Sequence, residues 1–136
     1  MNRAAYRTLA RVEDQHWWYL GMRATALSLL LGFGDPGELL DAGCGTGGWL
    51  QALARARGAH RPAVALDLYR YALEWAGRRG IGQRCQATVT ALPLASECFD
   101  SVSSLDVVYH QAVGSDLAAL REFYRVLRPG GRLLIQ

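Results

Sequence analysis

The chain has no lysine, only three cysteines and no long apolar run, and the last two shortages each exclude a class of protein. Its cysteines, Cys44, Cys85 and Cys98, are an odd number without a CxxC pair, so neither a disulfide framework nor a zinc site is expected. The longest apolar stretch, 24–33, is too short to cross a bilayer, and the first residues lack the apolar core of a signal peptide. We therefore expect a cytoplasmic protein without a membrane or metal site.

Charge is modest and dispersed. All fifteen basic residues are arginines spread along the chain, and with twelve acids the net charge is +3. Such a small excess names no nucleic-acid partner. A length of 136 residues without repeats or linkers indicates one domain.

The hydrophobic pattern alternates between helical and strand periods. Apolar residues spaced three to four apart predict helices, and continuous apolar runs closed by turn residues predict buried parallel strands. The class is therefore α/β: a doubly wound, mostly parallel, Rossmann-like sheet with helices on both faces. Residues 1–34 are expected to form a helical cap and 35–136 the core. Helices are predicted at 3–15, 22–31, 48–57, 71–79 and 116–127, and strands at 38–41, 63–66, 82–88, 99–105 and 132–135.

A glycine-rich segment, residues 41–48 (DAGCGTGG), follows the first predicted strand. Ligands of open parallel sheets bind beyond such strand ends, and glycines let the backbone approach them. The spacing also fits the GxGxxG pattern of dinucleotide-binding proteins, which leaves a nicotinamide-dependent oxidoreductase as an alternative. Asp41 places a carboxylate where it would repel a pyrophosphate and attract an ammonium group. Asp67 closes the second strand, where a carboxylate accepts ribose hydroxyls or caps the following helix.

Residues 40–47 closely resemble the first motif of class I S-adenosylmethionine-dependent methyltransferases. The similarity continues in register through Asp67, the Leu-Pro segment at 92–94, the stretch 99–110 and the turn at 125–131. The element His16-Trp17-Trp18-Tyr19 with Arg23 is similar to the N-terminal part of members that modify small molecules and sugars. The resemblance implies S-adenosylmethionine as cofactor, S-adenosylhomocysteine as product and a small-molecule methyl acceptor.

The resemblance also implies roles for individual residues. Asp67 would bind the ribose. If the segment Trp17–Tyr19 covers the cofactor, Arg23 would meet the methionine carboxylate in a bidentate pair. Leu68, Thr88 and Val89 would surround the adenine, although many members have an acid where Thr88 stands. The methionine end would be held by Asp41, Gly43, Cys44, Gly45, Thr46, Gly47 and the backbone of Leu105.

His110 is the one histidine expected at a strand's carboxyl end near the acceptor. An imidazole there would serve as general base for an alcohol or phenol, or play a structural role. The segment Trp17–Tyr19 would either pack on the sheet, at least through one tryptophan, or cover the cofactor. His16 and His60 are given no role.

Family domains continue beyond strand five into a helix and a β-hairpin, whereas this chain ends at Gln136. We therefore expect an exposed strand-five edge that promotes self-association. A cofactor-binding fragment without turnover is the alternative to an active methyltransferase.

Overall fold

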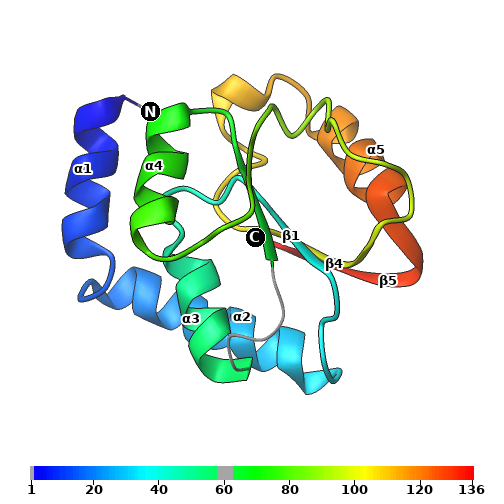
Figure 1. Ribbon diagram of the computed structural model, residues 1–136, viewed down its shortest axis with the longest axis horizontal. Coiled ribbons are helices and arrows are strands. Elements are labelled where there is room, and N and C mark those ends of the chain that lie inside the picture. The colour runs from blue at the N-terminus through cyan, green and yellow to red at the C-terminus, as the bar shows by residue number, and fades with distance from the viewer. Residues whose placement is uncertain (1, 58–62) are drawn as a thin grey trace.

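The structure, a computed structural model, describes residues 2–57 and 63–136, so His60 lies outside the described residues. Its centre is a five-stranded parallel sheet in the order β3-β2-β1-β4-β5 (Figure 1), which confirms the predicted class. The strands are β1 (Leu39–Ala42), β2 (Ala63–Asp67), β3 (Arg84–Gln86), β4 (Phe99–Ser104) and β5 (Leu127–Ile135). The helices are α1 (Arg3–Val12), α2 (Trp17–Gly32), α3 (Gly48–Arg57), α4 (Arg70–Arg78) and α5 (Asp116–Val126), with a short 3₁₀ turn, η1, at Gln111–Val113.

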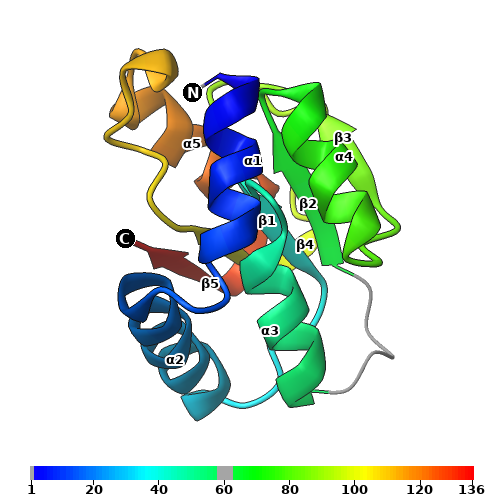
Figure 2. The same cartoon turned by 90° about the vertical axis from the view of Figure 1, so that its left-hand side faces the viewer.

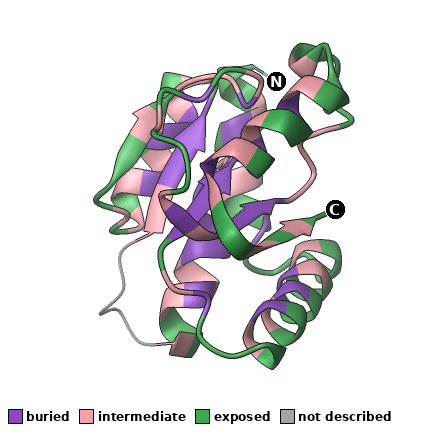
Figure 3. Cartoon of the chain, turned by 90° about the vertical axis from the view of Figure 1, so that its right-hand side faces the viewer, coloured by how far each residue is buried: buried purple, intermediate pink, exposed green. Residues whose placement is uncertain are grey.

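Both faces of the sheet are covered, because successive side chains of a strand point to opposite sides. In β1, Leu39 packs with the apolar residues of α2, α3 and α4. Leu40 points the other way, into a cluster with Phe123 of α5 and Val89 of the segment that follows β3. Figure 3 shows the resulting buried band along the central strands. The strand order reverses between β1 and β4, which is where ligands bind in such sheets.

Helix α1 lies beside α4 at the carboxyl edge of the sheet (Figure 2). Its start is capped by Asn2, whose side chain accepts a hydrogen bond from the amide of Ala5 at 2.9 Å. The buried ring of Tyr6 makes an edge contact with Tyr71, with the ring centroids 5.2 Å apart. The first helix is thereby fastened over the strand ends. In the described part of the chain, no helix has the length and apolar character that crossing a bilayer requires.

Helix α2 differs most from its prediction, since it begins at Trp17 and not at Met22. The ring of His16 caps it, with Nδ1 accepting a hydrogen bond from the amide of Trp18 at 3.3 Å. The expectation that one tryptophan packs on the sheet is wrong: Trp17 is 74% exposed and Trp18 44% exposed. The prediction places the helix start too late for two reasons. The cluster of aromatic residues is interpreted there as a separate segment that packs on the sheet, and histidine is an uncommon helix N-cap.

Strand β5 begins at Leu127, before the predicted Arg132. Leu127 pairs with Phe99 and Arg132 with Ser101, so residues 128–131 loop out of the ladder. Gly130 has a φ of +78° in this bulge, which suits glycine. Beyond it, β5 runs parallel to β4 and forms one edge of the sheet.

Candidate functional site

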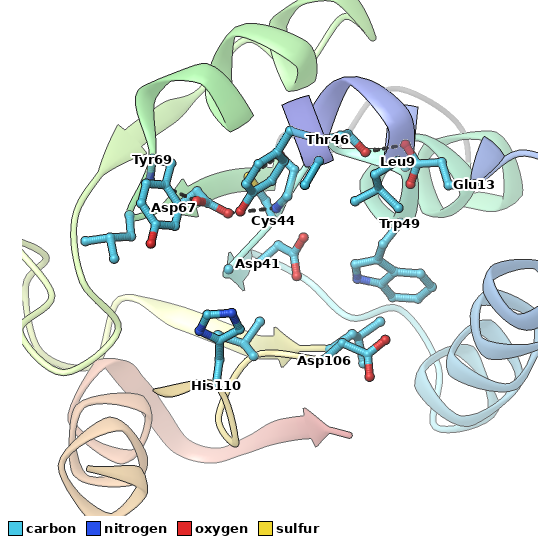
Figure 4. Close-up of a pocket in the computed structure, with 18 of the residues that line it drawn as sticks. Leu9, Glu13, Asp41, Cys44, Thr46, Trp49, Asp67, Tyr69, Asp106 and His110 are labelled. Atoms are coloured by element: carbon cyan, nitrogen blue, oxygen red, sulfur yellow. Dashed lines mark hydrogen bonds between the residues drawn. The ribbon is translucent and has the colours of Figure 1, made fainter. Parts of the chain in front are cut away.

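A pocket of about 600 Å³ opens at the carboxyl ends of β1, β2 and β4, beneath α1 (Figure 4). This volume lies in the range of natural small-molecule sites. Of the predicted site residues, all except Gly47 line it: Arg23, Asp41, Gly43, Cys44, Gly45, Thr46, Asp67, Leu68, Thr88, Val89, Leu105 and His110.

The glycines of the loop have different physical roles. Gly43, Gly45 and Gly47 all have positive φ angles, of 91°, 54° and 80°. A Cβ added at Gly45 would meet no heavy atom within 4 Å, so this backbone faces open space in the pocket. At Gly47 it would lie 3.0 Å from the Cα and Cβ of Ala76 in α4. Gly45 therefore allows a ligand to approach, whereas Gly47 allows the loop to pack against α4.

Asp41, one residue before the end of β1, is 2% exposed and lines the pocket. Burial raises its pKa to about 7, and the negative charge of Asp67 adds to the shift, while a hydrogen bond from Ser103 opposes it. The hydroxyl of Ser103 donates to Oδ1 at 2.7 Å. Among the described residues, none donates a hydrogen bond to Oδ2. A cationic ligand group would therefore be stabilised beside Asp41.

Asp67 holds the loop as well as facing the pocket. Its Oδ2 accepts a hydrogen bond from the amide of Gly45 at 2.9 Å, and its Oδ1 accepts one from the amide of Tyr69, also at 2.9 Å. Burial raises the pKa of this carboxyl, and the hydrogen bonds that it accepts from these two amides and from the hydroxyl of Tyr6 moderate the rise. The carboxylate thus anchors two backbone amides while it lines the pocket.

Glu13, from the residues just after α1, is a buried carboxylate that the sequence analysis missed. It accepts hydrogen bonds from the hydroxyl of Thr46, from Arg23 at 2.5 Å and from Arg79 at 2.6 Å. Nothing in the sequence distinguishes Glu13 from a solvent-exposed acid on a charged helix. Its burial depends on partners that are distant in the chain, which is why sequence analysis missed it. The network joins the N-terminal segment to the glycine loop.

Arg23 is therefore already paired at its terminal nitrogens, which bind Glu13 and Asp14. This arrangement differs from the expected bidentate pair with a cofactor carboxylate. Its Nε is the one buried side-chain nitrogen or oxygen without a hydrogen-bond partner within residues 2–57 and 63–136. Arg23 is 7% exposed and lines the pocket. A single hydrogen bond from Nε to a ligand carboxylate would satisfy this donor.

The expected adenine end lies between β2 and β3. Leu68 is 39% exposed at the pocket wall and Val89 is buried beneath it. The hydroxyl of Thr88 lies 2.9 Å from that of Thr90, so it keeps a polar partner without a ligand. Cys44 is buried, and burial raises the pKa of its thiol. It contributes backbone and volume to the pocket, because a neutral buried thiol is unreactive.

The other end of the pocket is lined by Tyr19, Asp106, Tyr109 and His110. The Oδ2 of Asp106 accepts a hydrogen bond from the indole of Trp18 at 3.5 Å, which connects α2 to the segment after β4. The Nδ1 of His110 accepts one from the amide of Ala112 at 3.2 Å. A neutral imidazole bonded in this way carries its proton on Nε2 and is a donor there. The arrangement therefore disfavours His110 as a general base.

Comparison with known proteins agrees with this geometry. Residues 40–135 match the family described as methyltransferase domain. A malonyl-[acyl-carrier protein] O-methyltransferase of Pseudescherichia vulneris is 36% identical over 130 residues, covering 94% of this chain and 49% of that protein. A human protein named probable tRNA methyltransferase 9B is 35% identical over 105 residues, covering 74% of this chain and 21% of its own length. The chain thus spans about half or less of these relatives.

Solved structures show the same fold. One from Methanococcus maripaludis, described as an S-adenosyl-L-methionine-dependent methyltransferase, superposes with a TM-score of 0.81 at 23% identity. The match covers 98% of this chain and 63% of that one. The family match leaves the nicotinamide-dependent alternative without support.

Proposed function

Because the chain belongs to the class I S-adenosylmethionine-dependent methyltransferases, we propose that it binds this cofactor and serves methylation of a small molecule. The observation that carries the proposal is the placement of two buried carboxylates, Asp41 and Asp67, at the pocket where the strand order reverses. The bound cofactor supplies an activated methyl group on a sulfonium, so the protein chiefly orients the reactants and excludes water.

The residues present fit the cofactor's chemistry. Within the described residues, Oδ2 of Asp41 has no hydrogen-bond donor and can accept from an ammonium group, and Nε–H of Arg23 has no acceptor and can donate to a carboxylate. The open backbone at Gly45 and the carboxylate of Asp67 are suited to a ribose. Leu68, Thr88 and Val89 would flank the adenine, with the Leu105 backbone and the loop at Gly43, Cys44 and Thr46 at the methionine end.

A small-molecule acceptor is favoured over a nucleic acid by the charges at the pocket. The only arginine lining it in the described part of the chain is Arg23, whose terminal nitrogens are neutralised by Glu13 and Asp14. Asp106 at the other end would repel phosphates, which nucleic-acid sites attract with free cations. Because one relative is named a probable tRNA methyltransferase, methylation of RNA is the result that would contradict this proposal.

His110 would act as a hydrogen-bond donor to the acceptor through Nε2, in keeping with its tautomer. Proton removal from an acceptor would then fall to the carboxylate of Asp106, to bulk water or to an acceptor that is already deprotonated. His110→Gln retains an amide donor, and we expect it to keep more activity than His110→Ala.

The test is a calorimetric titration with S-adenosylhomocysteine, S-adenosylmethionine and NAD. We expect the two sulfur compounds to bind and NAD not to, since Asp41 opposes a pyrophosphate. Binding of NAD alone would overturn the proposal. A labelled-methyl assay against alcohols, amines and tRNA then separates an active enzyme from the alternative, a module that binds cofactor without turnover.

The proposal also includes the cellular location of the protein and its self-association. The three cysteines are unpaired, which supports the reducing cytoplasm as its location. The β5 edge carries Leu133 and Ile135, 38% and 42% exposed, which supports self-association of this chain through that edge.

A further inference from the structure

A buried hydrogen-bond relay leads from α3 through β4 to Asp41. The indole Nε1 of Trp49 donates to the hydroxyl of Ser103 at 3.0 Å, and that hydroxyl donates to Oδ1 of Asp41 at 2.7 Å. The three residues are 5%, 0% and 2% exposed. Trp49 and Asp41 also line the pocket, and Figure 4 shows them side by side beneath α1.

The direction of this relay follows from the donor inventory. An indole nitrogen is only a donor, so the oxygen of Ser103 must accept from Trp49. The single hydroxyl proton of Ser103 is then left for Asp41, and Oδ1 must be an acceptor. Any proton on the carboxyl of Asp41 is therefore confined to Oδ2, the oxygen with no donor among the described residues.

Neighbouring serines show that this is not the general pattern of the strand. Ser101 and Ser104 are equally buried on β4, but their hydroxyls donate to the backbone carbonyls of Pro36 and Ala42. Those bonds satisfy polar groups inside the fold. Only at Ser103, of these three, does the hydroxyl bond a side chain that faces the pocket.

We propose that Trp49 and Ser103 are positioning residues that fix the Asp41 carboxylate and leave Oδ2 to accept the cofactor's ammonium group. The inference rests on the proposed cofactor and specifies how its amino end is recognised. The hydrogen bond from Ser103 to Oδ1 already restricts rotation of the carboxylate in the free protein. Less conformational entropy is therefore lost when the cofactor binds. The bond from Ser103 also favours the ionised carboxylate, in opposition to burial and to Asp67.

The test compares two probes on three variants. S-adenosylhomocysteine carries the ammonium group, whereas 5′-methylthioadenosine has the same adenosine and lacks the amino acid. For Ser103→Ala we expect a loss of about tenfold in affinity for S-adenosylhomocysteine, the value of one charge-assisted hydrogen bond, and no change for methylthioadenosine. The pH at which binding is half-maximal should rise. Trp49→Phe should act in the same direction but less, because the hydroxyl remains.

Ser101→Ala is the matched control, a buried serine on the same strand that lies outside the pocket lining. It should lower stability without changing the affinity ratio of the two probes or the pH profile. If Ser103→Ala lost the same affinity for both probes, or lost none, the proposed positioning role of Ser103 would be overturned. Failure of the wild-type chain to bind either probe would instead overturn the proposed function, so the two failures are distinguishable.

Discussion

The hydroxyl of Thr46 in the glycine loop donates a hydrogen bond to the carboxylate of Glu13, 33 residues earlier in the chain. The same carboxylate binds Arg23 and Arg79, so one buried acid joins α1, α2, α4 and the loop. The segment over the pocket is therefore held by buried ion pairs in addition to the aromatic contacts of Tyr6. This differs from the rest of the fold, where the sheet and its helices are held by apolar packing.

Replacing Glu13 should weaken the attachment of the N-terminal segment over the pocket and destabilise the fold. We expect Glu13→Gln to lower the free energy of unfolding by about 2–4 kcal/mol, because it leaves the buried guanidinium of Arg23 and the partly buried one of Arg79 with only Asp14 as an anion. Urea denaturation measures the change. Glu74→Gln is the control: Glu74 is 45% exposed with pairs at 3.7 Å, and its loss should cost under about 0.5 kcal/mol. Equal effects would show that the buried network contributes no more than a surface pair.

Gly45→Ala and Gly47→Ala should separate ligand approach from packing. Both residues have positive φ, but only a Cβ at Gly47 would crowd α4, through Ala76. We expect Gly47→Ala to lose about 1–3 kcal/mol of stability. Gly45→Ala should lose less stability and more affinity for S-adenosylhomocysteine. Thermal unfolding and calorimetry on both variants test the contrast, and the reverse ranking would contradict it.

Asp67→Ala should weaken cofactor binding by about 1–3 kcal/mol, the cost of leaving polar partners unsatisfied. Asp100→Ala is a control of the same type, since Asp100 accepts from the amide of Glu38 and pairs with Arg128 away from the pocket. It should affect stability alone. Unchanged affinity in folded Asp67→Ala would mean that Asp67 only holds the amides of Gly45 and Tyr69.

The strands and the glycine loop could be predicted because their signals are local. The apolar runs that lead to Asp41 and Asp67 locate the carboxyl ends of two strands and two of the carboxylates that line the pocket. Glu13 and Ser103 could not be found in this way. Nothing near them in sequence marks them as special, and their roles arise from partners 33 and 62 residues away. Gly47 shows the converse: its motif position implies ligand contact, whereas its actual neighbour is α4.

Cofactor binding should depend on the protonation of Asp41. Its pKa in the free protein is raised to about 7, chiefly by burial, and a bound ammonium group would lower it. Affinity for S-adenosylhomocysteine should therefore be constant well above pH 7 and fall by up to about tenfold per pH unit below it. Near pH 7, binding should release protons, which calorimetry in buffers of different ionisation enthalpy detects.

Other groups at the pocket make controls necessary. Asp67 and Cys44 face Asp41, Glu13 and Arg23 lie across the pocket, and Asp106 and His110 line its far end. Asp41→Asn should bind more weakly and lose the pH dependence. His110→Gln should retain the pH dependence. A slope that disappears with His110 and persists without Asp41 would contradict the assignment.

Stability should respond to the same group with the opposite sign. A carboxyl whose folded pKa lies above its unfolded value of 3.8 stabilises the fold only while protonated. As pH rises from about 4 to 7, Asp41 should therefore reduce the free energy of unfolding, by about 4 kcal/mol at most. Asp14, Asp100 and Glu122, whose pKa values are lowered, oppose this trend. Asp41→Asn should be more stable than the wild type above pH 7, as urea denaturation at several pH values would show.

The edge of the sheet at β5 leads to the last prediction. Leu133 and Ile135 are 38% and 42% exposed on a strand that pairs, among the described residues, only with β4. An unpaired parallel edge with apolar side chains recruits other chains, and a charge on such an edge prevents this. We expect this chain to sediment as larger species with rising concentration, and Leu133→Lys to shift it toward the monomer. Leu117→Lys, on the exposed face of α5 where Leu117 is 54% exposed, adds the same charge away from the edge and should not. A wild-type chain that stays monomeric at high concentration, or equal effects of the two lysines, would show that β5 is not the contact.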